Sequence, residues 1–209
     1  MKRILCLFLA LTLLSGCASI FGGGITLAQS SKPRNTSPLS NAQDQSQLVA
    51  DNTSFAFDLY NQLKSRPGNL FLSPYSISAA LAISQVGARG QTLAQMNRAL
   101  HFSLPFEALH PAFNALQLSL NQREKNAQDA RKKDFTLKTV NALWGEKTYV
   151  FRLEYLDFLA ENYGLGLRLV DFKKNFEASR QAINNWVTGE TEQRIKDLFP
   201  PGSFDEYTT

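Results

Sequence analysis

Apolar side chains recur every three or four residues along much of the chain, a spacing typical of helices that pack on one face. Phe55, Leu59 and Leu63 follow this spacing and predict a first helix that ends near Pro67-Gly68. The same spacing predicts four later helices, over residues 92–100, 106–120, 156–163 and 176–187. The first of these four should begin with a capping box, because its opening residues read Thr-x-x-Gln.

Two stretches are strand-like, residues 134–144 and 165–172, because they are rich in residues that favour extended backbone. Beyond Gly189 the chain is expected to be extended, with a break at Pro200-Pro201-Gly202. Several helices with only about three strands indicate an α+β fold in one domain, residues 48–209. Roughly 160 residues are enough to bury a hydrophobic core.

The most informative segment is residues 69–80, where a strand end and a helix start are encoded together. Leu70 to Leu72 form a short apolar run that predicts a strand. Ser73 is a suitable N-cap, and Pro74 falls at the first helical position, where its missing N–H costs nothing. The helix should run to Val86 and stop at Gly87.

This segment resembles the signature of the serpin family of protease inhibitors. The matching positions include Asn69, Ser73, Pro74, Ser76 and Ile77. Later stretches resemble the family in the same order, from about residue 55 to residue 209, and include four further signature positions: Asn141, Phe172, Asn184 and Thr191. The chain departs from the family pattern where serpins usually have glycine and this sequence has Gln193, so a turn with positive φ would be strained there.

The resemblance implies a serpin-like α+β fold that is incomplete at its C-terminus. The N-terminal helices would accompany the first strands of a large mixed sheet whose other strands come later in a serpin. Unpaired strand edges favour aggregation, so we expect this chain not to reach a stable serpin fold alone. We expect it to be part of a longer reading frame; the alternative is a genuinely truncated product, inactive as an inhibitor.

The resemblance also implies a function. Serpins inhibit serine, and sometimes cysteine, proteases as suicide substrates, by inserting a cleaved loop into the central sheet. The residues that correspond to Ser73 and Ser76 lie where that sheet opens, under the helix that matches residues 175–188; Ser73 also has a purely structural role as a helix cap. The reactive loop is absent from this chain, so the target protease cannot be named. The alternative is a noninhibitory serpin-fold binding or scaffold protein.

The N-terminus has the order of a secretory signal, with Lys2 and Arg3 before the apolar run 4–14. Leu-Ser-Gly-Cys at residues 14–17 resembles a bacterial lipobox, which predicts a signal peptide over residues 1–16 and a lipid on Cys17. Residues 17–47, rich in Gly, Pro, Ser, Asn and Gln, are expected to form a flexible tether. The protein would be exported and held on a membrane, facing the periplasm or the cell exterior; an ordinary signal and a secreted protein are the alternative.

Charge and residue types exclude several functions. The net charge of +4 comes from 22 basic and 18 acidic residues, so no nucleic-acid partner is indicated. A basic cluster near Arg131, Lys132 and Lys133 is interrupted by acids and is interpreted as a solvated loop; weak contact with a sulfated polysaccharide is the alternative. With only His101 and His110 and no hydrolase, zinc-protease or phosphate-binding motif, we expect no enzyme activity, cofactor or metal site.

Overall fold

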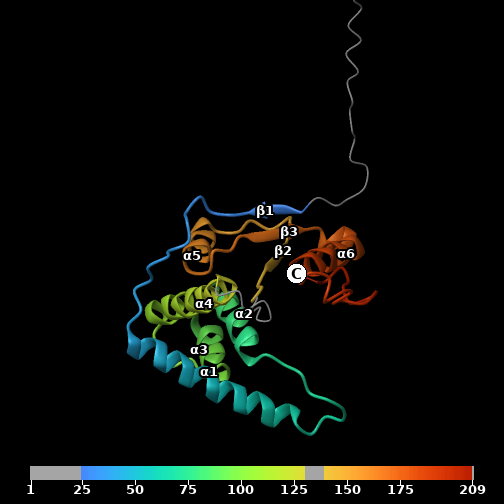
Figure 1. Cartoon of the computed structure of the whole chain (residues 1–209). Coiled ribbons are helices and arrows are strands. Elements are labelled where there is room, and N and C mark those ends of the chain that lie inside the picture. Colours follow the sequence, from blue (N-terminus) through green and yellow to red (C-terminus); the bar gives the residue numbers. More distant parts are fainter. Residues whose placement is uncertain (1–24, 130–138, 209) are drawn as a thin grey trace, which may run out of the picture.

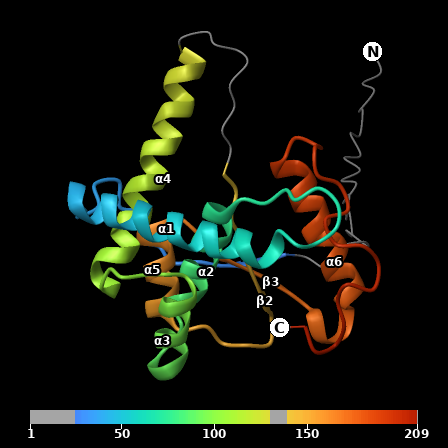
Figure 2. The ribbon, with the colours of Figure 1, turned by 90° about the horizontal axis from the view of Figure 1, so that it is seen from below.

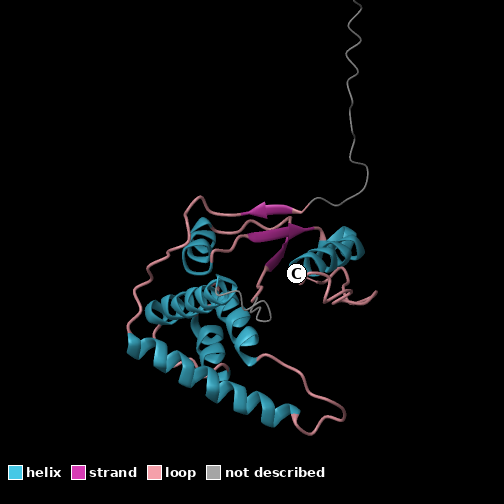
Figure 3. Cartoon of the chain, viewed as in Figure 1, coloured by secondary structure: helices cyan, strands magenta, loops and turns pink. Residues whose placement is uncertain are grey.

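The structure is a computed structural model that describes residues 25–129 and 139–208 (Figure 1). Side chains near the end of the longest helix, at residues 124, 125 and 127–129, are also left undescribed. Within the described ranges the chain forms helices and three short strands (Figure 3). In chain order they are β1 (Thr26–Ala28), α1 (Ala42–Leu63), α2 (Pro74–Gln85), α3 (Gly90–Ala99), α4 (Phe106–Asp129), β2 (Leu143–Glu146), α5 (Leu153–Tyr163), β3 (Leu167–Val170) and α6 (Phe172–Glu190).

The three strands form one mixed sheet in the order β1-β3-β2. β2 runs parallel to β3, with Trp144 opposite Arg168, and β1 runs antiparallel to β3, with Leu27 opposite Arg168. The parallel pair is joined through α5, as expected because parallel strands need a crossover connection. β3 is therefore the central strand of the described sheet.

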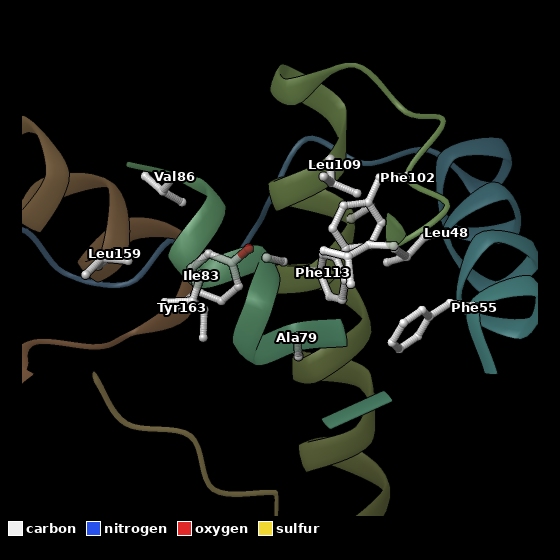
Figure 4. Packing of buried hydrophobic residues seen from close by; sticks show 13 residues of the cluster. Leu48, Phe55, Ala79, Ile83, Val86, Phe102, Leu109, Phe113, Leu159 and Tyr163 are labelled. Atoms are coloured by element: carbon white, nitrogen blue, oxygen red, sulfur yellow. The ribbon is translucent and has the colours of Figure 1, made fainter. Parts of the chain in front are cut away.

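The main hydrophobic core lies among the helices on one side of the strands (Figures 1 and 4). α1 packs against α2 and α4, and α4 packs against α5. Leu48 of α1, Leu109 and Phe113 of α4, and Leu159 of α5 are almost completely buried. Small residues of α2, such as Ala79 and Ala82, let the neighbouring helices come close, which explains why this helix has few bulky side chains.

A second, smaller core joins α6 to the sheet. Its buried members are Val170, Phe172, Ile183 and Val187, and partly buried aromatic residues surround them: Trp144, Trp186, Phe199 and Phe204. Figure 2 shows α6 and the segment that follows it on the opposite side of the strands from α1 and α2. The sheet thus separates the helical core from the core of α6.

Two helix boundaries predicted from sequence are confirmed. α2 begins at Pro74, and the Ser73 hydroxyl accepts a hydrogen bond from the Ser76 N–H at 3.4 Å. α5 ends at Tyr163, where Gly164 adopts φ +65° and supplies the left-handed C-cap that glycine favours. Both boundaries depend on local chemistry that a short stretch of sequence contains.

Other boundaries differ from the prediction. Residues 70–72 do not form a strand, and the Phe71 side chain is fully exposed, because no strand of the described residues lies beside this run. Thr92 does not begin a helix, since α3 already starts at Gly90 and makes no side-chain cap bond. β2 covers only Leu143 to Glu146, and residues 139–142 before it are extended without a ladder partner. α4 continues past Leu120 to Asp129.

Residues 25–47 do not form the flexible tether that their composition predicts. β1 pairs with β3, and α1 begins at Ala42, well before Phe55. Asn41 caps α1 by accepting a hydrogen bond from the Asp44 N–H at 2.8 Å, and Leu48 in the second turn is fully buried. A polar composition misled the prediction because these residues gain order from contacts with distant elements rather than from a core of their own.

Candidate functional site

The outer edge of β2 is the first feature of the candidate site. β3 pairs with one edge of β2, and no described residue pairs with the other. An open strand edge presents backbone N–H and C=O groups that another strand can complete. This edge is therefore a place where the sheet can be extended.

An apolar groove of about 490 Å³ lies between this strand and α6. Val140, Ala142 and Trp144 line it from the β2 side, at alternate positions that share one face of an extended chain. The side chains that line it from α6 and the following segment are mostly apolar: Phe172, Ile183, Trp186, Val187, Ile195, Leu198, Phe199 and Phe204. The open edge and the groove together offer main-chain pairing and apolar burial in one place.

Arg168 holds α6 over the sheet through two aromatic rings. Its guanidinium carbon lies 5.8 Å from the ring centroid of Trp144 and 5.0 Å from that of Trp186. The two indole rings meet edge to face, with centroids 5.8 Å apart. Each cation–π contact stabilises the packing by about 1 kcal/mol. α6 is thereby fastened to both β2 and β3.

Glu146 fastens the N-terminal end of α6. Its side chain is fully buried, and its carboxylate accepts hydrogen bonds from the backbone N–H groups of Phe172 at 2.7 Å, Thr148 at 3.1 Å and Lys173 at 3.3 Å. Burial raises the pKa of Glu146, but these N–H groups together outweigh it and bring the pKa below its ordinary value. A charged carboxylate therefore joins the end of β2 to the first turn of α6.

Asp171 adds a second anchor at the same helix end. Its side chain caps α6 by accepting from the Lys174 N–H at 2.9 Å, and it forms an ion pair with Lys147 at 2.9 Å. The hydrogen bond from Lys147, with the bond from the Lys174 N–H, lowers the pKa of Asp171 to about 2. Negative charge at this end also suits the helix dipole.

The C-terminal part of α6 holds the chain that leaves it. The Asn184 amide donates to the Phe199 carbonyl at 2.8 Å and accepts from the Phe199 N–H at 3.0 Å. The Thr191 hydroxyl donates to the Val187 carbonyl at 2.7 Å and accepts from the Ile195 N–H at 3.1 Å. These two signature positions therefore have structural roles in fixing residues 195–199 against the helix.

The turn after Thr191 bears out the expectation drawn from Gln193. Gln193 adopts φ +63° and Glu192 adopts φ +51°, both in the left-handed region. A residue with a Cβ is disfavoured there by roughly 1 kcal/mol relative to glycine. The departure from the family pattern therefore places real backbone strain at this turn.

The predicted sheet-opening serines lie together at the start of α2. Their hydroxyl oxygens are 2.9 Å apart, and the Ser73 side chain is exposed while Ser76 is half-buried. The structure gives neither hydroxyl a hydrogen bond to α6. Of the other signature residues, Asn69 is exposed in the loop before α2, and Asn141 lines a small cavity of about 270 Å³ with Arg168. The sheet-opening role of the serines remains a prediction.

Some predicted residues lie outside the described residues, namely Cys17 and the basic positions Arg131, Lys132 and Lys133. Their lipid and polysaccharide roles therefore remain predictions. Over residues 25–129 and 139–208, no helix has the length and apolar character needed to cross a bilayer. In the same ranges, no group of three or more His, Cys, Asp or Glu side chains could hold a metal ion.

Comparison with known proteins decides the family. The model of the serpin family, described as serine protease inhibitor, matches residues 50–209. The chain belongs to the serpin family.

Relatives of this serpin include the leukocyte elastase inhibitors of Sus scrofa, 43% identical over 164 residues, and Homo sapiens, 40% identical over 164 residues. Each match covers 78% of this chain and 41% of the relative, so the chain spans about two fifths of the length of these relatives. Among solved structures, a tumour suppressing serpin matches with a TM-score of 0.67 at 27% identity, over 80% of this chain and 42% of that one. Emu ovalbumin matches with a TM-score of 0.62 at 28% identity, over 77% of this chain and 43% of that one.

Reasoning from sequence missed Glu146, Arg168 and Trp186 as the residues that attach α6 to the sheet. Trp186 lies two residues after Asn184, in a stretch that the family resemblance did include. Glu146 and Arg168 carry no motif, because a charged residue in a short strand gives no sign of whether it is buried. Only the packing of α6 across the sheet gives these side chains their roles.

Proposed function

We propose that this chain is the N-terminal part of a serpin that inhibits serine endopeptidases as a suicide substrate. The observation that supports the proposal is the open edge of β2, beside an apolar groove and with α6 packed over the same strand. Such an arrangement is suited to strand addition, in which main-chain hydrogen bonds and alternate side chains are satisfied together. The relatives named as elastase inhibitors support the same function.

In this proposal the open β2 edge receives the next strand of the sheet from a later part of the protein. The target enzyme cleaves a loop near the C-terminus of the complete serpin and becomes linked to it as an acyl enzyme. The loop then enters the sheet as a new strand before the acyl bond is hydrolysed, and the enzyme is displaced and deformed. α6 must shift for this insertion, so its attachments through Glu146, Arg168 and Asn184 influence how readily the sheet opens.

The test uses the mature protein, by which we mean the product of the complete reading frame expressed without residues 1–17. It is mixed with a panel of serine proteases and separated on a denaturing gel. We expect a covalent complex with at least one protease, and no complex when the catalytic serine of the same protease has been blocked beforehand. Cleaved inhibitor and free enzyme with every protease would overturn the proposed inhibition.

The same gel also distinguishes the second candidate function, that of a noninhibitory serpin that acts as a binding or scaffold protein. This candidate predicts no covalent complex with any protease of the panel. Residues 18–209 alone should likewise form no complex, because we expect the reactive loop to lie in a later part of the protein. A complex with residues 18–209 would contradict our view that later parts of the protein are needed.

We also propose that the protein is exported and lipidated at Cys17, because the Leu-Ser-Gly-Cys sequence follows a charged and then an apolar region. Eight peptide units join Cys17 to Ile25, so the first described residue lies within about 28 Å of the lipidated residue. This serpin would then stand close to the membrane, facing the periplasm or the cell exterior. Labelling with a radioactive fatty acid should mark the full chain and its Cys6→Ala variant but not Cys17→Ala; labelling of Cys17→Ala would refute the anchor.

A further inference from the structure

Residues 25–35, called the strap from here on, lie across the outer edge of β3 and then along α5 (Figure 1). β1, the first part of the strap, pairs antiparallel with β3, with Thr26 opposite Leu169 and Ala28 opposite Leu167. The Asn35 N–H, at the other end, donates to the Glu161 carbonyl of α5 at 2.9 Å. The strap is thus bound at both ends by main-chain hydrogen bonding.

The C-terminal end of the strap also binds through side chains to a buried amide on α4. Arg34 donates from Nε to the Asn114 Oδ1 at 2.9 Å and from Nη2 to the Gln117 Oε1 at 3.0 Å. Asn114 is fully buried, and its Nδ2 donates to the Asn35 carbonyl at 2.8 Å. Without the strap, only a 3.4 Å bond to the Glu161 carbonyl would remain for this amide. A buried amide whose partners come mainly from the strap indicates a site built to receive it.

The charges of the strap and of α5 are also complementary. The Lys32 Nζ lies 3.1 Å from a Glu161 carboxylate oxygen and 3.4 Å from one of Asp157, and the Ser30 hydroxyl donates to Asp157. The hydrogen bond to Glu161 and the charge of Asp157 raise the pKa of Lys32. α5 therefore presents two acids at the positions where the strap carries a base and a hydroxyl.

Two glycines leave the space that the strap fills. A Cβ added at Gly166 would lie 2.9 Å from the Gln29 Cβ, 3.0 Å from a Leu27 methyl carbon and 3.3 Å from the Ala28 carbonyl oxygen. A Cβ added at Gly164 would lie 2.9 Å from the Arg34 Cδ. Gly166 does not adopt a positive φ, so the close approach of the strap is the reason that a side chain is excluded there.

We infer that β3, α5 and α4 form a peptide-binding surface whose occupant is the strap, a docked segment held by this surface rather than by a core of its own. The surface fits an extended peptide with small or apolar residues opposite the β3 edge and a base, then an arginine, farther along. The seated strap covers one edge of the described sheet and leaves the β2 edge as the place for extension. Its release would expose a second strand edge.

The inference is tested by cutting the strap free of the rest of the mature protein. A recognition sequence for a specific protease is inserted after Leu39, whose side chain is 90% exposed, and the native protein is cleaved there. We expect the N-terminal piece to stay bound on gel filtration at micromolar concentration, and a labelled peptide of residues 24–37 to replace it. The same peptide with Arg34→Ala should bind at least tenfold more weakly. Separation of the pieces, or equal binding of the two peptides, would overturn the inference.

A second variant leaves the strap unchanged. Gly166→Val places carbon atoms where Gln29 and Leu27 lie, so the strap should lift and the backbone amides of β3 should exchange with solvent at least tenfold faster. Gly189→Ala is the matched control, because an added Cβ there meets nothing within 4 Å. Unchanged exchange of β3 in Gly166→Val would refute a strap seated on this edge, and faster exchange confined to β3 and α5 would support it.

Discussion

Replacing Glu146 with alanine tests the attachment of α6 most directly. The change removes a fully buried carboxylate that accepts from the N–H groups of Phe172, Thr148 and Lys173. Thr148 and Lys173 are exposed enough for water to replace their partner, whereas Phe172 is buried and its N–H would be left without one. One buried orphan donor and two weakened bonds should cost about 3 kcal/mol in local stability.

The assay is hydrogen exchange of the Phe172 and Lys173 amides in the mature protein, combined with its unfolding midpoint in urea. We expect exchange at these two amides to rise by about a hundredfold. Lowering the pH should also weaken the attachment of α6 through Glu146. The pKa of Glu146 in the folded state lies below its ordinary value, so its stabilisation is present above about pH 4 and is lost as pH falls through that lower pKa.

The matched control is Glu154→Ala, because the Glu154 side chain is exposed and its ion pair with Arg152, at 3.4 Å, is exposed as well. A surface change of this kind should leave stability nearly unchanged. Equal exchange of the Phe172 amide in wild type and Glu146→Ala would show that the buried carboxylate does not hold the start of α6.

Three further predictions concern single positions. Burial lowers the pKa of His110 to about 4, so the free energy of unfolding should fall by roughly 3 kcal/mol as pH drops from about 6.5 towards 4. His110→Asn, which can still bond the Tyr163 hydroxyl, should lose this pH dependence. An unchanged dependence of stability on pH in this variant would exclude His110 as its source. Gln193→Gly should raise stability by about 1 kcal/mol, because glycine adopts the left-handed backbone conformation at this position without strain. Gln193→Ala keeps the Cβ and should not raise it. Equal effects of the two changes would show that the backbone is not strained there. Asn184→Ala should cost about 2 kcal/mol of stability and speed hydrogen exchange of the Phe199 amide, because it removes both bonds to the Phe199 backbone. The exposed Asn185→Ala is a near-neutral control. A Phe199 amide that stays protected in Asn184→Ala would show that Asn184 does not hold this segment.

Local sequence patterns predicted several parts of the fold correctly. The Ser73-Pro74 start of α2 and the Gly164 end of α5 follow from capping chemistry, which involves only neighbouring residues. The strain at Gln193 was foreseen because the family places glycine at this turn. The serpin family itself was recognisable from the segment that begins at Asn69, and the family match over residues 50–209 confirms it.

Tertiary structure decided the rest. An apolar run such as residues 70–72 becomes a strand only where a neighbour offers backbone partners, and Phe71 has none in the described part of the chain. The polar strap looked unstructured because its order comes from Asn114, Glu161 and the β3 edge, all at least 79 residues farther along the chain.

The sequence by itself therefore determined the Ser73 cap of α2, the Gly164 cap of α5, the α+β class and the family, because each depends on residues that are close together in the chain or on a recognisable motif. Only the tertiary structure decided that Glu146 and Arg168 attach α6, and that the strap occupies the free edge of β3. The physical reason is that burial, charge pairing and strand pairing are properties of surfaces that meet in space. A residue pattern read along one chain does not contain them.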